Sequence, residues 1–247
     1  MSRNPKVQEY YDRISIPETL ERLIEWFSDI SEHQEHGHRD RDTWKENGEI
    51  DKDNSGLRLI LLRTGQTTIC NCRYISGTAQ TLLKDVGIDS RFVEFIAANE
   101  LYGDVRHGAL EVSYRGDGRP AGKPVHVDLT MGVMFKGKDG EYLSSLDIKD
   151  AIAGDRFNDV EVHRLGNGKI VNPDFPTPNF QDVIDNEVKL REYYANVFNS
   201  IMIGNTVYTR NTTDYNFRDI RRNALSHMRD QLKFVDRNAF IDRFYQK

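Results

Sequence analysis

The 247-residue sequence is poor in cysteine, lacks long apolar runs and carries no excess of positive charge. Its two cysteines, Cys70 and Cys72, are separated by a single residue, so they cannot form a disulfide framework. No run of about 18 apolar residues is present, which argues against a membrane-spanning segment and a membrane partner. The formal net charge of −5 offers no basic surface to a phosphate backbone, so nucleic acid is not an expected partner.

The expected compartment follows from the absence of a secretory signal and of a disulfide framework. The polar segment 1–11 lacks the apolar stretch of a secretory signal. A chain with two cysteines and no disulfide framework suits a reducing environment, where a thiol can stay reactive. We therefore expect a cytoplasmic location.

The overall composition is that of a soluble globular protein, with 38% hydrophobic and 30% charged residues. There is no internal repeat and no low-complexity tract, and we expect a single domain over residues 1–247. Its predicted parts are N-terminal helices and a loop over 1–56, a core over 57–135, and a mostly helical C-terminal extension over 136–247.

Local patterns in the middle of the chain predict an α+β fold. Apolar residues at helical spacing predict a helix that begins near Asn71 and ends at Gly87, a residue type that favours helix C-termini. Strands are predicted over 90–97, 110–114 and 125–129. This order indicates a central helix packed on an antiparallel sheet. Further helices are predicted over 144–152, 180–202 and 214–247.

Cys72 lies at the predicted start of the central helix. Unpaired N–H groups and the positive end of the helix dipole favour a thiolate over a thiol at such a position. The backbone N–H of Cys72 also lies where it could meet a developing oxyanion. The alternative for either cysteine is a small buried hydrophobic residue.

Three sequence blocks strengthen the catalytic interpretation of Cys72. They are Cys72-Arg73-Tyr74 with Leu82-Leu83, Gly87-Ile88 and Arg91-Phe92-Val93; then His107-Gly108-Ala109-Leu110-Glu111-Val112; then Val127-Asp128-Leu129-Thr130. Their order and spacing resemble the core of the transglutaminase-like superfamily, and the resemblance covers roughly residues 67–135. In that family a cysteine is followed by an aromatic residue, a leucine pair and a Gly-Ile-x-x-Arg-x-Val block. The fifteen-residue spacing from Cys72 to Gly87 fits this pattern, whereas the seventeen residues from Cys70 do not.

The resemblance implies a transglutaminase-like (papain-like) fold and a catalytic triad. Cys72 would be the nucleophile, His107 the base, and Asp128 the group that orients the imidazole. The family aromatic residue after the histidine is absent, since Gly108-Ala109 stands there, and we expect more space beside the thiol or a different substrate wall. The family proline after the aspartate is replaced by Leu129.

The expected activity is attack of the thiol on an amide or ester carbonyl, followed by resolution of a thioester by an amine or by water. The expected partners are a small-molecule or peptide acyl donor and, for transfer, an amine acceptor. No cofactor or metal is expected. Two alternatives remain open: a cysteine protease or amidase, and a non-catalytic interaction module with the same fold.

Other residues are weaker candidates for the site. Gln66 is an oxyanion-donor candidate by analogy with papain-like thiol proteases, or else a loop glutamine in solvent. Possible cleft residues are Trp44, Tyr74, Tyr102 and His126. Strand alternation places His126 on the same face as Asp128, as a supporting partner or an alternative base. Arg91 is expected to pair within the sheet. The histidine-rich segment 32–42 is expected to be a solvated loop, with metal binding or covering of the cleft as alternatives.

Overall fold

The computed structural model describes residues 31–33, 68–70, 72–85, 88–96, 106–113, 123–165, 180–210, 217–218, 220–221 and 229–246. The predictions made for residues 1–30 and for Trp44, Gln66 and Tyr102 lie outside these ranges, as do those for most of segment 32–42. No helix among the described ranges combines the length and hydrophobicity that a membrane crossing requires.

A six-stranded sheet, in the order β10-β9-β8-β3-β4-β5, organises the described structure. Its strands are β3 (Ser90–Ile96), β4 (Arg106–Ser113), β5 (Pro124–Val127), β8 (Ser200–Ile203), β9 (Thr206–Thr209) and β10 (Lys233–Val235). The α+β class is confirmed. The three predicted strands pair antiparallel, β3 with β4 and β4 with β5. The sheet as a whole is mixed, because β10 runs parallel to β9. The cause is the connection: β8 and β9 form a hairpin across Gly204 (φ 60°), whereas β10 follows only after a long segment.

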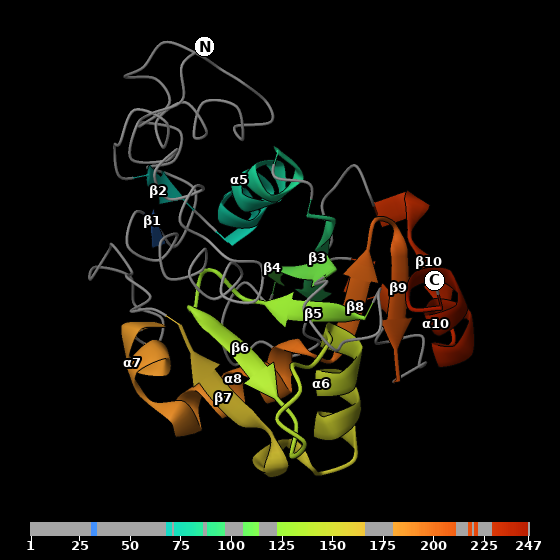
Figure 1. The fold of residues 1–247 in the computed structure, drawn as a ribbon. Coiled ribbons are helices and arrows are strands. Elements are labelled where there is room, and N and C mark those ends of the chain that lie inside the picture. Colours follow the sequence, from blue (N-terminus) through green and yellow to red (C-terminus); the bar gives the residue numbers. More distant parts are fainter. Residues whose placement is uncertain are drawn as a thin grey trace, which may run out of the picture.

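Two small sheets and the helices complete the described elements. The small sheets are β1 (Ser31–His33) with β2 (Thr68–Cys70), and β6 (Val133–Lys136) with β7 (Glu161–Arg164). The helices are α5 (Cys72–Asp85), α6 (Ser145–Ala153), α7 (Phe180–Asp185), α8 (Glu187–Val197) and α10 (Arg237–Phe244), with 3-10 turns η2 (Phe157–Asp159) and η3 (Arg229–Gln231). In Figure 1, α5 lies on one side of the sheet and α6 lies on the other, together with β6 and β7.

The predicted helix at 144–152 is confirmed by α6, whose start is fixed by a local sequence signal. Ser144 is the N-cap: its hydroxyl accepts from the backbone N–H of Asp147, and the Asp147 carboxylate accepts from the backbone N–H of Ser144. This reciprocal pair satisfies two N–H groups that would otherwise be unpaired.

The prediction of one helix over 180–202 is wrong. Asn186 ends α7 and starts α8, because its side-chain oxygen accepts from the backbone N–H groups of Val188 and Lys189. Beyond Val197 the chain forms the fully buried strand β8. In the extension 136–247 the described residues supply the strands β7, β8, β9 and β10 beside the helices. The described part of 214–247 likewise contains β10 as well as α10.

The two faces of β3 and β4 have different neighbours. On one face, Ser76 of α5 donates through its hydroxyl to the carbonyl of Gly108, 3.4 Å away. On the opposite face, Phe95 and Ala109 belong to one hydrophobic cluster with residues of α8. The α8 members of that cluster are Leu190, Tyr193, Tyr194 and Val197. The strands therefore lie between two layers, one from α5 and one from the C-terminal half of the chain.

Candidate active site

Asp128 immediately follows β5 and is held rigidly by its own turn. One carboxylate oxygen, Oδ1, accepts from the backbone N–H groups of Thr130 and Met131, each at 3.0 Å. The backbone of Asp128 also exchanges two hydrogen bonds with Val133, both of 3.0 Å. The turn that closes here contains Gly132 with φ 62°. The Asp128 side chain and Gly132 thus shape this turn, in which Leu129 stands where the family pattern described above has a proline.

His107 lies inside β4, which begins four residues earlier than the predicted strand. Its Nε2 atom is 2.5 Å from Oδ2 of Asp128. Its ring is 3% exposed and stacks on Phe95 at 6.5 Å between centroids. Cys72 forms a side-chain hydrogen bond with the same imidazole. Because Nε2 faces the carboxylate, Nδ1 is the ring nitrogen left for the sulfur.

The electrostatics of this group favour an ion pair. Burial alone would lower the pKa of His107, but the charge and hydrogen bond of Asp128, with those of Cys72, raise it to about 10. Burial would raise the pKa of Asp128, but the charge and hydrogen bond of His107 lower it to about 2. At neutral pH the imidazole is therefore protonated and the carboxylate ionised. An imidazolium beside a cysteine favours the thiolate.

Cys72 is the first residue of α5 and is partly exposed. Its helix is tied to the sheet by Arg73, whose Nη2 lies 2.9 Å from both carboxylate oxygens of Glu94 on β3. No acidic residue occupies the first turn of α5, so nothing there competes with an anion at the sulfur. The structure therefore brings together the three residues that the sequence blocks selected. Cys70 lies in β2, and the side chains of Cys70 and Tyr74 are outside the described set.

Gly108 allows α5 and β4 to approach one another. A Cβ atom at this position would lie 2.7 Å and 2.8 Å from ring carbons of Phe92, and 3.5 Å from Cα of Arg73. The next residue, Ala109, is buried on the opposite face. The expected extra space beside the thiol is therefore not found at Gly108, because the ring of Phe92 and the backbone of α5 occupy it.

His126 lies on the same side of the sheet as the His107–Asp128 pair but is completely buried. Its Nδ1 is 2.9 Å from the hydroxyl of Ser145, and no hydrogen-bond partner for Nε2 is present among the described residues. Burial lowers its pKa to about 4, although the charge of Asp128 opposes that change. His126 is thus neutral at pH 7. Because the His126 side chain has no exposed surface, it does not line a substrate cleft as expected.

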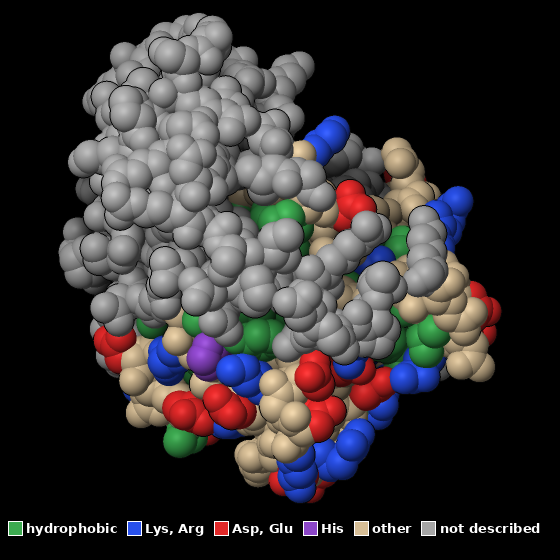
Figure 2. Space-filling view, viewed as in Figure 1, with side chains coloured by type: hydrophobic (Ala, Val, Ile, Leu, Met, Phe, Trp, Pro, Cys, Tyr) green, Lys and Arg blue, Asp and Glu red, His purple; other side chains and the backbone are tan. Residues whose placement is uncertain are grey.

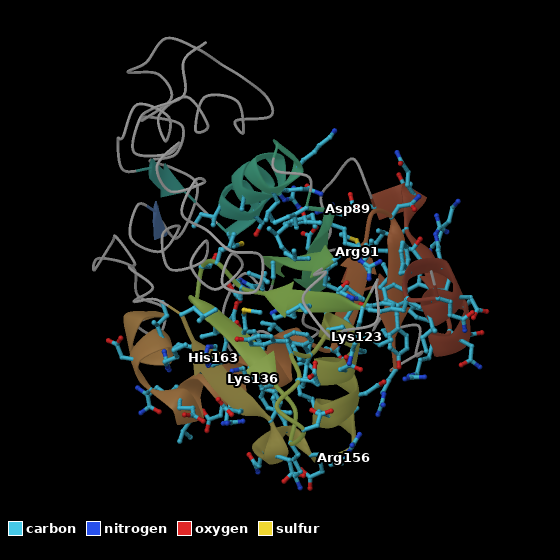
Figure 3. All side chains as sticks on the ribbon, viewed as in Figure 1. Asp89, Arg91, Lys123, Lys136, Arg156 and His163 are labelled. Carbon is cyan, nitrogen blue, oxygen red and sulfur yellow. The ribbon has the colours of Figure 1, made fainter. Side chains whose placement is uncertain are left out.

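Arg91 pairs within the sheet, as expected, with Glu111 of β4 at 2.8 Å from Nε and 2.6 Å from Nη2. The other oxygen of Glu111 accepts from the backbone N–H of Ser145 and from the hydroxyl of Tyr245. Arg91 also donates to the carbonyl of Phe244 at 2.5 Å, so the end of α10 is joined to β3 and β4. Figure 3 labels Arg91 on this part of the sheet.

Sequence reasoning missed the contribution of α8 to the site. The hydroxyl of Tyr194 donates to Oδ2 of Asp128, and the ring of Tyr193 meets the His107 ring edge-on at 5.7 Å. Both tyrosines lie outside the three sequence blocks. Two aromatic residues on an amphipathic helix indicate a buried face and nothing more, so no signal in the sequence marked them as neighbours of the triad.

Within the described ranges, no group of three or more His, Cys, Asp or Glu side chains is arranged to hold a metal ion. Figure 2 shows Lys and Arg side chains interleaved with Asp and Glu on the described part of this face. Ion pairs among the described residues include Lys123–Asp147 and Lys138–Asp159.

Comparison of the chain with protein-family models, with curated proteins and with solved structures gave no match.

Proposed function

We propose that this chain is a cysteine enzyme of the transglutaminase-like type, a cysteine acyltransferase or amide hydrolase that works through a thioester. The observation that carries the proposal is the hydrogen-bonded series Cys72–His107–Asp128, in which the thiol begins a helix and the carboxylate is fixed by its own turn. The three groups match the roles of nucleophile, base and orienting acid. The resemblance of the three sequence blocks points to the same chemistry.

In the first half-reaction, the Cys72 thiolate attacks an acyl carbon and forms a carbon–sulfur bond. The carbonyl oxygen takes the electron pair and becomes an oxyanion, which the backbone N–H of Cys72 at the start of α5 can stabilise. When the intermediate collapses, the bond to the leaving amine or alcohol breaks. The His107 imidazolium gives that leaving group its proton, and a thioester remains on Cys72.

In the second half-reaction, the now neutral imidazole takes a proton from an incoming amine or water. The nucleophile attacks the thioester, and the departing sulfur regains its negative charge opposite a protonated His107. Asp128 stays ionised throughout and holds the ring so that Nδ1 faces the sulfur. We assign the donor to the class of small-molecule or peptide acyl groups, with an amine as acceptor, in the reducing cytoplasm where the thiol persists.

The first test is alkylation of the full chain by iodoacetamide at pH 6.5, read by peptide mass spectrometry. Cys72 should react much faster than Cys70, because the Cys72 thiol lies beside the protonated imidazole of His107. The variant His107→Asn should slow alkylation of Cys72 and leave Cys70 unchanged. Slow and equal labelling of both cysteines would overturn the proposal in favour of a non-catalytic module.

The second test measures acyl transfer directly with p-nitrophenyl acetate. The wild-type chain should release nitrophenolate in a burst of about one equivalent and gain an acetyl group on Cys72, whereas Cys72→Ala should do neither. Adding hydroxylamine or an aromatic amine then divides the outcomes. Faster turnover with an acetylated amine as product indicates acyl transfer, and unchanged turnover indicates hydrolysis.

A further inference from the structure

Tyr194 is joined directly to the proposed catalytic pair although it comes from α8. Its hydroxyl donates to Oδ2 of Asp128, which is the same oxygen that receives Nε2 of His107. The other oxygen, Oδ1, is taken by the backbone N–H groups of Thr130 and Met131. All of these groups are buried. Among the described residues, four groups donate to the Asp128 carboxylate, and Tyr194 and His107 are the two side chains of this set.

The hydroxyl of Tyr194 is a permanent donor. Burial, together with the charge of Asp128 and its hydrogen bond, raises the pKa of Tyr194 well above 10, so the phenol keeps its proton. The ring is held by aromatic neighbours, with Phe135 edge-on at 4.8 Å and Phe198 at 5.6 Å. The end of α8 is fixed in turn by Lys149, whose Nζ donates to the carbonyl of Phe198 at 2.7 Å and to that of Asn199.

A phenol that donates to a carboxylate oxygen takes up part of its negative charge. The carboxylate then supports the imidazolium less strongly, so Tyr194 limits how far Asp128 raises the pKa of His107. The hydrogen bond from Tyr194 accordingly lowers the pKa of Asp128. A full positive charge on His107 is the condition under which Cys72 is held as a thiolate.

We propose that Tyr194 is a positioning residue of this active site: it fixes Oδ2 of Asp128 and takes up part of the negative charge that supports the His107 imidazolium, and thereby sets how much of Cys72 is thiolate at a given pH. The inference rests on the proposed function. The simpler alternative is a buried tyrosine that uses Asp128 only to satisfy its own hydroxyl. Under that alternative the tyrosine contributes to stability and leaves the pH dependence of Cys72 unchanged.

The experiment compares the rate of Cys72 alkylation from pH 4 to 9 in the wild type and in Tyr194→Phe, which removes only the hydroxyl. Because Asp128 then presents its whole charge to the imidazolium, the midpoint of the rise should move down by about one pH unit, so that well below the midpoint alkylation is about tenfold faster. The matched control is Tyr208→Phe on β9. Tyr208 is equally buried and its hydroxyl is bonded to Arg210, but it does not touch the triad, and the profile should not move.

A second arm shows whether Tyr194 acts through Asp128. In an Asp128→Asn background, Tyr194→Phe should cause no further change. Site-specific replacement of Tyr194 by 3-fluorotyrosine keeps the shape and strengthens the donor, so the midpoint should move to higher pH. This arm also serves if Tyr194→Phe does not fold.

The outcomes separate the two proposals. An unmoved midpoint in the phenylalanine or fluorotyrosine variant overturns the role of Tyr194, as does an effect of Tyr194→Phe that persists in the Asp128→Asn background. Failure of the wild type to alkylate rapidly at neutral pH overturns the proposed function itself.

Discussion

Replacing Asp128 by asparagine tests the central electrostatic feature of the site with almost no change of shape. Asparagine retains an oxygen for the backbone N–H groups of Thr130 and Met131. Its amide nitrogen then takes the place of Oδ2, where two donors converge, Nε2 of His107 and the hydroxyl of Tyr194. The new amide N–H group then faces two other hydrogen-bond donors. His107 relieves its part of this conflict when it gives up its Nε2 proton and accepts a hydrogen bond from the new amide.

The consequence for chemistry is a base with its proton on the wrong nitrogen. The neutral imidazole carries hydrogen on Nδ1, which faces Cys72, so it cannot take the thiol proton and no longer holds a thiolate by charge. An unassisted cysteine with a pKa of about 8.5 is only about 1% thiolate at pH 6.5. We therefore expect alkylation of Cys72 at pH 6.5 to fall about 100-fold, and acyl transfer to fall by up to about 10⁴-fold.

The same substitution has a stability effect whose pH dependence is set by His107. Raising the pKa of a buried imidazole from 6.5 to about 10 corresponds to as much as ~5 kcal/mol, at about 1.4 kcal/mol per pKa unit. This contribution is fully present below pH 6.5 and is lost as the pH rises through about 10. Asp128→Asn should therefore destabilise the fold by about 3–5 kcal/mol at pH 7 and by much less at pH 10.5.

The assay is urea unfolding followed by circular dichroism at pH 7 and at pH 10.5, beside the alkylation rates. The matched control is Asp159→Asn, which breaks the exposed pair with Lys138 and should change stability by less than about 1 kcal/mol at either pH. Wild-type alkylation kinetics in Asp128→Asn would refute the reasoning, because Asp128 would then not be what keeps His107 charged. A destabilisation that does not depend on pH would refute the linkage to His107.

Two further predictions concern the neighbours of the triad. Gly108→Ala should lower the free energy of unfolding by about 1–3 kcal/mol in urea titrations, because the new methyl group meets the ring of Phe92 at 2.7 Å. The control is Gly154→Ala, where the closest atom belongs to the flexible Arg156 side chain, and this change should lower the free energy of unfolding by less. Equal losses in the two variants would contradict this explanation. His126, whose pKa is lowered from 6.5 to about 4, supports a stability contribution that is present above pH 6.5 and is lost as the pH falls through 4. Between pH 7 and pH 4.5 the wild type should therefore lose about 2 kcal/mol more than His126→Gln, and parallel stability curves would show that His126 does not titrate as inferred.

The local parts of the structure could be predicted because their causes are local. The start of α5 near Cys72, the short helix α6 and the pairing of Arg91 across neighbouring strands depend on residues close in sequence or on strand alternation. The order of the three blocks was enough to select Cys72, His107 and Asp128, which the structure brings together. Their catalytic role remains a proposal.

The parts that could not be predicted depend on contacts between distant residues. Tyr194 lies 66 positions from the carboxylate that it contacts, and the guanidinium of Arg91 binds the carbonyl of Phe244, 153 positions away. The predicted helix over 180–202 includes the residues of β8, because four apolar or small residues after a helical pattern are too few to distinguish a strand period from a helix period. The pairing of β8 with β3 on one side and with β9 on the other decides that they form a strand.

The position of β3 inside the sheet determines when the surroundings of the Cys72 thiol can be completed during protein synthesis. This strand lies between β4 and β8, so one of its flanks is supplied about a hundred residues later in the chain, where the hydroxyl of Ser200 reaches the carbonyl of Ile96. On the ribosome, Cys72 emerges long before α8 and β8 have been translated. The buried surroundings of His107 and Asp128 are therefore completed late in synthesis, because Tyr193 and Tyr194, which contact these two residues, belong to α8.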